Sequence, residues 1–285
     1  MPDPSNKRLT LSQRLGLRPL PEPTTGVPDH LLRPLIDWFA RWVQDDRMVK
    51  QIALRLQIAY TPKAVGWREL GEAGSFIAAV MAHKDRQTLL LDAVDAALEY
   101  RGPLGSERAN SFDPEAWEGL DSILSAGASA WSVGPERTSL VRRVDEAVGA
   151  LTNEAVAAAS PSAHDHLVTA WTAVYSRSPD PGVGYDEAVL AIEAAAGPVV
   201  LPNDRNRTLG KVLGHLKATS GEWQVSGGQP IEPLVALIDQ VWTRQPRHAP
   251  GDQPTRRAQP GEAEFAVHVA AMAVHAFSRG LVTKK

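Results

Sequence analysis

The 285-residue sequence contains no cysteine. This absence excludes disulfides, thiolate metal sites, iron–sulfur clusters and cysteine nucleophiles. The sequence also lacks a run of about 18 uninterrupted apolar residues, the length that a membrane-spanning helix needs. The first ten residues, MPDPSNKRLT, have no apolar core of a secretory signal. We therefore expect a cytoplasmic protein with no membrane partner.

A strong excess of one charge is also missing, because 30 Lys and Arg stand against 33 Asp and Glu, for a net charge of −3. This balance excludes a globally basic nucleic-acid binder but is compatible with a local basic patch. The sequence contains no GxGxxG, no P-loop, no GxSxG and no HExxH motif, so we expect no cofactor and no metal. Its 43% of hydrophobic and 22% of charged residues are typical of folded globular proteins.

The apolar pattern and the prolines predict a mainly α fold in four segments. Residues 1–28 form a proline-rich arm that has room for one helical turn near residue 10. Residues 29–103 form a helical N-terminal domain, with Asp29 as the N-cap of its first helix. Residues 104–160 hold a linker helix, which begins at Pro114, and a small β-hairpin. Residues 161–285 form a C-terminal helical bundle.

Strand structure is predicted only at about Ala130–Val144, where two alternating stretches flank a Gly-Pro turn. The helices of the C-terminal bundle are predicted at about 163–177, 185–200, 208–218, 231–242 and 262–279. Alanines on the last helix allow close helix approach and predict a homodimer through this bundle: Ala263, Ala266, Ala270, Ala271 and Ala273.

Several phrases of the sequence carry a family resemblance. LTLSQRLGLRPLPEP at residues 9–23 resembles the start of bacterial abortive-infection proteins with an AbiJ-like N-terminal domain. AWSV at 130–133 and VRRVD at 141–145 resemble the family's middle hairpin. YDEAVLAIEAAA at 185–196, TLGKVL at 208–213 and the Arg247-His248 pair resemble its C-terminal domain, a helical bundle similar to the HEPN superfamily. The resemblance implies antiphage defence and a ribonuclease that needs no metal.

HEPN ribonucleases resemble one another in an Arg and a His that meet at a dimer interface, with four to six residues between them and a polar residue just after the Arg. A His near the scissile phosphate shuttles protons and an Arg stabilises the developing charge. Arg247 and His248 are the candidate catalytic residues, with Arg244 as the alternative cation, although only three residues separate Arg244 from His248. The alternative is that Arg247 and His248 are ordinary loop residues beyond a helix end, where cations are favoured.

Two further groups of cations are candidate nucleic-acid-binding residues. Arg256 and Arg257 continue the basic segment that begins at Arg244, and clustered guanidinium groups suit phosphates. Arg205, Arg207 and Lys211 surround Thr208, where the amides of a helix N-terminus would add to an anion site. In both cases the alternative is a solvated surface with no ligand.

The histidines and acids of the bundle give no second signal. His164 and His166 are two residues apart on a predicted helix and point to different sides, so a joint metal site is not expected. Glu187 and Glu193 are six apart and are not predicted to pair. The sequence thus predicts a protein that binds or cleaves RNA by metal-independent His/Arg chemistry, or else a non-catalytic helical module for nucleotide, RNA or protein.

Overall fold

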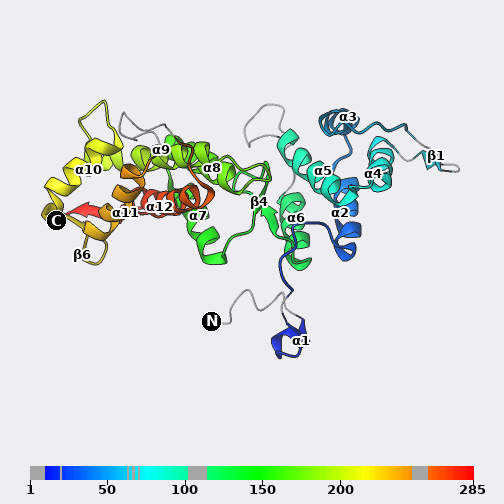
Figure 1. Cartoon of the computed structure of the whole chain (residues 1–285), viewed down its shortest axis with the longest axis horizontal. Coiled ribbons are helices and arrows are strands. Elements are labelled where there is room, and N and C mark those ends of the chain that lie inside the picture. Colours follow the sequence, from blue (N-terminus) through cyan, green and yellow to red (C-terminus); the bar gives the residue numbers. More distant parts are fainter. Residues whose placement is uncertain are drawn as a thin grey trace. The chain divides into compact units, whose positions relative to one another are not determined.

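The computed structural model describes residues 10–19, 21–62, 64–65, 68–69, 71–101, 114–245 and 256–285. Helices dominate the described chain, and the predicted mainly α fold is confirmed (Figure 1). The chain forms two compact units, Met1–Arg143 and Val144–Lys285. The segment 104–160 is therefore shared between the units. None of the described helices combines the length and the hydropathy of a membrane-spanning segment.

The first unit contains a helical core, which a short N-terminal helical turn precedes in the sequence. Its helices are α1 (Leu11–Arg14), α2 (Asp29–Trp42), α3 (Asp46–Arg55), α4 (Glu72–Ala82), α5 (Arg86–Arg101) and α6 (Pro114–Ala126). Leu35, Phe39 and Phe76 are fully buried in this core. The N-cap of α2 is Pro28 rather than Asp29, which is the first helical residue. An acid there still faces the positive end of the helix dipole.

The predicted hairpin is present and is fixed to the first unit by polar contacts. Strands β3 (Trp131–Val133) and β4 (Leu140–Arg142) pair antiparallel, with Val133 opposite Leu140. The backbone amide of Leu140 donates to Oδ1 of Asp95 on α5 at 2.6 Å. The indole of Trp131 donates to the carbonyl of Thr25 at 2.9 Å. Because two strands alone are marginally stable, these contacts hold the hairpin on the helices.

The second unit is a bundle around α9. Its helices are α7 (Glu146–Ala158), α8 (Pro161–Tyr175), α9 (Pro181–Val200), α10 (Leu209–Ala218), α11 (Glu232–Thr243) and α12 (Pro260–Ser278). Helices α8 and α12 both pack along α9, and Figure 1 shows them side by side. The small side chains of α9 and α12 permit this close approach, and the Tyr185 hydroxyl donates to the carbonyl of Val241 at 2.6 Å.

The alanines that predicted a homodimer are buried inside this unit. All five have relative exposures of 1% or less: Ala263, Ala266, Ala270, Ala271 and Ala273. Helix α12 uses them against its own neighbours α9, α8 and α7. The homodimer stays a prediction, and this stripe is not the surface that would form it.

The prediction that strand is confined to about Ala130–Val144 is wrong. The pair β1 (Ala64–Val65) and β2 (Arg68–Glu69) lies in the first unit, and β5 (Trp223–Val225), β6 (Gln229–Pro230) and β7 (Val282–Lys284) form a sheet in the second. Each of these strands has two or three residues, which is too short to show a period of two in the sequence. The pairing of β5 with β7 also joins segments far apart in the chain.

Candidate functional site

The residues first expected to be catalytic are only partly described. Arg247 and His248 lie outside the described residues, so their role stays a prediction. Arg244 directly follows α11 as its C-cap, and its side chain is exposed. The neighbouring Gln245 donates from Nε2 to Oδ1 of Asp186 on α9 at 3.2 Å. This contact fixes the end of α11 to the bundle.

Arg256 is committed to an ion pair inside the chain. Its guanidinium makes two hydrogen bonds of 2.6 Å to the carboxylate of Glu262 in the first turn of α12. Together with the amide of Gln259, this bidentate contact lowers the pKa of Glu262 to about 2. A phosphate would compete with this carboxylate for Arg256. Arg257, by contrast, is exposed and makes no side-chain contact with the described residues.

The N-terminus of α10 is occupied by protein acceptors. The predicted helix start at Thr208 is confirmed, because Thr208 Oγ1 accepts a hydrogen bond from the amide of Lys211 as the N-cap. Glu193 reaches across from α9, and its Oε2 accepts from the amide of Leu209 at 2.7 Å. The ammonium of Lys211 binds Oδ2 of Asp204 at 3.0 Å. These contacts fill the places that an anion would take at this helix end.

Arg207 fastens the loop between α9 and α10. Its Nε donates to the carbonyls of Leu201 and Asp204, and its Nη2 donates to the carbonyl of Pro202 at 3.1 Å. The stem lies against Gly197, where a Cβ atom would approach Arg207 Cδ to 3.1 Å. A larger residue at position 197 would require the Arg207 side chain to shift. Nε and Nη2 of Arg207 are thus used in the fold, and only Nη1 has no hydrogen bond to a described residue.

Arg205 differs from the neighbouring cations. Its side chain is exposed, and it makes no hydrogen bond or ion pair with any described residue. It also lies on the rim of an open pocket of about 370 Å³ in the second unit. Residues from the start of α8, from one face of α9 and from the loop before α10 line this pocket: Ser160, Ser162, His166, Leu190, Glu193, Ala194, Pro198, Arg205 and Arg207.

His166 lines this pocket and is oriented by a carboxylate from another helix. Nδ1 of His166 on α8 lies 2.6 Å from Oε2 of Glu187 on α9. An ionised carboxylate only accepts hydrogen bonds, so Nδ1 carries the hydrogen and Nε2 is the atom left for a ligand. The two side chains are 33% and 25% exposed. This arrangement of a carboxylate behind a histidine fixes the ring and its tautomer.

The first turn of α8 adds donors beside His166. Ser160 is its N-cap but makes no side-chain capping bond, and Pro161 follows at the first helical position. The hydroxyls of Ser160 and Ser162 are exposed at the pocket. The pocket thus brings together an oriented imidazole, a free guanidinium and two hydroxyls, which suit a ligand that carries a phosphate.

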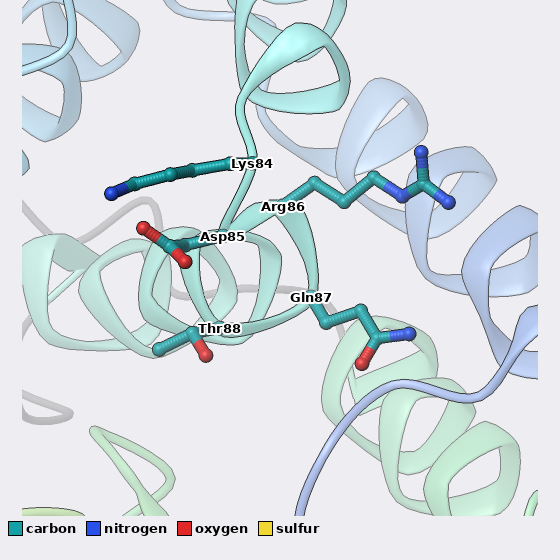
Figure 2. Close-up of a pocket in the computed structure, with 5 residues that line it drawn as sticks. All are labelled: Lys84, Asp85, Arg86, Gln87 and Thr88. Atoms are coloured by element: carbon teal, nitrogen blue, oxygen red, sulfur yellow. The ribbon is translucent and has the colours of Figure 1, made fainter.

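A second pocket, in the first unit, does not combine groups in this way. It measures about 440 Å³ and is lined by one continuous segment: Lys84, Asp85, Arg86, Gln87 and Thr88. Figure 2 shows that Lys84 and Asp85 point to one side, whereas Arg86 and Gln87 point to the other. Side chains of both charges that diverge from one turn do not form a convergent binding site.

A third polar cluster lies between α8 and α12. The hydroxyl of Tyr175 lies 2.7 Å from Nε2 of His268 and 3.1 Å from Oε1 of Glu264. Burial lowers the pKa of His268, an effect that the Glu264 carboxylate partly opposes. Tyr175 is only 4% exposed, whereas Glu264 is exposed, and the Tyr175 hydroxyl joins the two helices.

The sequence therefore located two parts of the pocket, Arg205 and Arg207, but not the His166–Glu187 pair at its centre. No local signal links these two residues, because they lie on different helices and meet only when α8 and α9 pack. Among the described residues, no group of three His, Asp or Glu side chains is arranged as metal ligands. Comparison with protein-family models, curated proteins and solved structures finds no match for this chain.

Proposed function

We propose that the second unit binds RNA at the pocket between α8, α9 and the loop before α10, and cleaves it there without a metal. The observation that carries this proposal is the contact between His166 and Glu187 beside the unpaired Arg205. A histidine with a fixed tautomer and a free guanidinium are the two groups that cleavage through the RNA 2′-hydroxyl needs.

In the proposed reaction Nε2 of His166 takes the proton of a 2′-hydroxyl. The resulting oxygen attacks the adjacent phosphorus, and the bond to the 5′-oxygen breaks. The leaving 5′-oxygen takes a proton from the imidazolium, so that the products are a 2′,3′-cyclic phosphate and a 5′-hydroxyl. Arg205 binds the phosphate oxygens and stabilises the charge that develops on them. Glu187 holds the ring and its tautomer.

The decisive experiment uses the purified full chain, RNA labelled at its 5′ end, and an excess of chelator. We expect cleavage to persist in chelator and to leave cyclic phosphate ends. Replacement of the 2′-hydroxyls by 2′-O-methyl groups abolishes cleavage, because the nucleophile is gone. Cleavage that requires added Mg²⁺, or that proceeds on 2′-O-methyl RNA, contradicts the proposed chemistry.

Arg247 and His248 form a competing catalytic pair within the same proposal. In their favour is the resemblance of the C-terminal phrases to abortive-infection proteins, in which an Arg-His pair acts on RNA. In favour of His166 is the carboxylate that orients it. Single His166→Ala and His248→Ala variants distinguish these two sites.

A non-catalytic binding module is the second candidate function. Three of the predicted cations, Arg207, Lys211 and Arg256, already contact partners within the chain. Fewer cations are then left to stabilise charge at a phosphate during cleavage, which favours binding without catalysis. Of the five predicted nucleic-acid-binding cations, this leaves Arg205 and Arg257 exposed and without a side-chain partner among the described residues. RNA that is bound with salt-dependent affinity but never cleaved supports this function.

The family resemblance supplies the cellular context of the proposal, which is abortive infection in the cytoplasm. A ribonuclease of this kind arrests the growth of its host. We expect expression of the wild-type chain to slow bacterial growth and the His166→Ala variant to restore it. If the wild type and His166→Ala arrest growth equally at equal protein levels, the growth arrest does not depend on the pocket.

A further inference from the structure

The pocket contains one acid whose presence phosphate binding does not explain. Glu193 lines the pocket together with Arg205 and Arg207. Only its Oε2 is bonded, to the amide of Leu209, and among the described residues Oε1 makes no hydrogen bond and the carboxylate makes no ion pair. A carboxylate at this place repels a phosphate. It is therefore suited to a different, hydrogen-donating part of the ligand.

The wall of the pocket next to Glu193 is apolar. Leu190, Ala194 and Pro198 are spaced four residues apart and therefore share one face of α9. Leu190 and Pro198 are exposed there. Such a surface accepts the face of a nucleobase, while the cations and hydroxyls at the rim take the phosphate. The volume of about 370 Å³ suits one nucleotide rather than a duplex.

We infer that Glu193 selects the base in this pocket and favours bases with an exocyclic amino group over uracil. This inference rests on the proposed binding of RNA. The N4 amino group of cytosine donates to a carboxylate. Uracil has an oxygen at the same position, and two facing acceptors repel each other. Cytosine and uracil have the same shape, so they differ here mainly in this one hydrogen bond.

The test measures the binding of fluorescent 2′-O-methyl octanucleotides of cytosine and of uracil to the full chain. The 2′-O-methyl groups prevent cleavage, so binding is measured alone. We expect the cytosine oligonucleotide to bind about tenfold more tightly, the usual size of such a discrimination. Oligonucleotides of N4,N4-dimethylcytosine, which lacks the donor, are expected to bind wild-type protein as weakly as uracil does.

Glu193→Gln is the matching variant of the protein. Its amide oxygen can still accept from Leu209, and its NH₂ group now faces the base as a donor. We expect the preference for cytosine to fall below twofold or to change to uracil. Glu154→Gln, which removes an exposed carboxylate on α7, controls for the change in net charge and keeps the tenfold preference. Circular dichroism checks that both variants are folded.

The outcomes separate this inference from the proposed function. Equal binding of both oligonucleotides by the wild type, with an affinity that Arg205→Ala weakens, overturns the base selection alone. A preference that Glu193→Gln leaves unchanged also overturns it. Failure of both oligonucleotides to bind overturns the proposed function and the base selection together.

Discussion

Nδ1 of His166 on α8 lies 2.6 Å from Oε2 of Glu187 on α9, and this contact orients an imidazole that lines the pocket of the second unit. The two helices bring together residues that the sequence places 21 positions apart. The contact leaves Nε2 for a ligand beside Arg205. Its value for function lies in the fixed tautomer, since a freely rotating histidine would present either nitrogen.

Removal of the imidazole tests the catalytic role of this contact. We expect His166→Ala to lower the rate of RNA cleavage by about 10²–10⁴-fold, the usual contribution of a positioned acid–base group. Glu187→Gln keeps the shape of the pair but loses its charge, so its rate falls less and its pH–rate profile shifts. Cleavage kinetics on a defined oligonucleotide measure both effects. If His248→Ala abolishes cleavage and His166→Ala does not, the catalytic site lies outside the pocket.

The salt dependence of RNA binding tests which cations contact phosphates. Each contact with single-stranded RNA contributes about −0.7 to the slope of log affinity against log salt. Arg205→Ala removes an exposed, unpaired guanidinium and is expected to reduce the slope by about one contact. Arg256→Ala removes a cation that already binds Glu262, so its slope stays close to that of the wild type.

Arg257→Ala completes this series, because Arg257 is exposed and lies next to Arg256. A reduced slope for Arg257→Ala extends the binding surface from the pocket toward residue 257. Fluorescence anisotropy between about 50 and 300 mM salt, a range over which the Debye length shortens, gives all three slopes. An unchanged slope in Arg205→Ala removes the pocket rim from the phosphate contacts.

The Arg256–Glu262 pair predicts a specific loss of stability in acid. The pKa of Glu262 is about 2 in the folded chain, below its ordinary value of 4.5. The unfolded state therefore binds the proton more tightly, and the contribution of the pair, present above pH 4.5, is lost as the pH falls toward 2. Because both side chains are more than a third exposed, solvent screening limits the contribution to about 1 kcal/mol or less.

Urea unfolding of the full chain at several pH values measures this loss. We expect Glu262→Gln to be less stable than the wild type at pH 6 and to lose the difference near pH 2.5. Arg256→Gln shows the same convergence, since it removes the other half of the pair. A difference between wild type and Glu262→Gln that is constant with pH assigns the effect to the cap of α12 rather than to the charge.

Two glycines give opposite predictions for the packing of the second unit. A Cβ atom at Gly184 on α9 would lie 2.5 Å from Cγ2 of Val174, so Gly184→Ala forces α8 and α9 apart. We expect a loss of about 1–3 kcal/mol. Gly214 on α10 has nothing within 4 Å of such an atom, and Gly214→Ala is expected to stabilise the helix by about 0.5–1 kcal/mol.

Thermal unfolding of the two variants checks this pair of predictions. Both substitutions have the same effect on backbone entropy in a helix. Opposite changes in melting temperature therefore isolate the effect of packing at Gly184. Gly184 lies on α9 where that helix packs against α8, and the same two helices hold Glu187 and His166. Gly184→Ala is therefore also expected to lower the rate of RNA cleavage, whereas Gly214→Ala leaves the rate unchanged. Equal melting temperatures for the two variants contradict the close packing of α8 on α9.

Local features of the sequence were sufficient for the helices. Apolar residues spaced three and four apart predict the helical character of residues 29–103 and the helices α8 to α12, although not the bounds of α7. The start of α10 at Thr208 agrees with its capping bond. The turn at Gly134 and Pro135 likewise predicts the hairpin of β3 and β4. These features depend on neighbours within one or two turns, and the sequence alone contains that information.

Contacts between distant segments were decided by the tertiary structure. The sequence shows neither the pairing of β5 with β7 nor the contact of His166 with Glu187. Each joins two elements that are separate in the sequence and meet only in the folded second unit. The partners of Arg207, Lys211 and Arg256 are local instead, since they lie three to seven residues away in the sequence, but the loop conformations that bring them together have no regular period to predict them. A charge in a sequence indicates a possible ligand contact, but its neighbours in space determine whether it is free. Packing of α8 on α9 brings His166 to Glu187, and it thereby forms the centre of the candidate site.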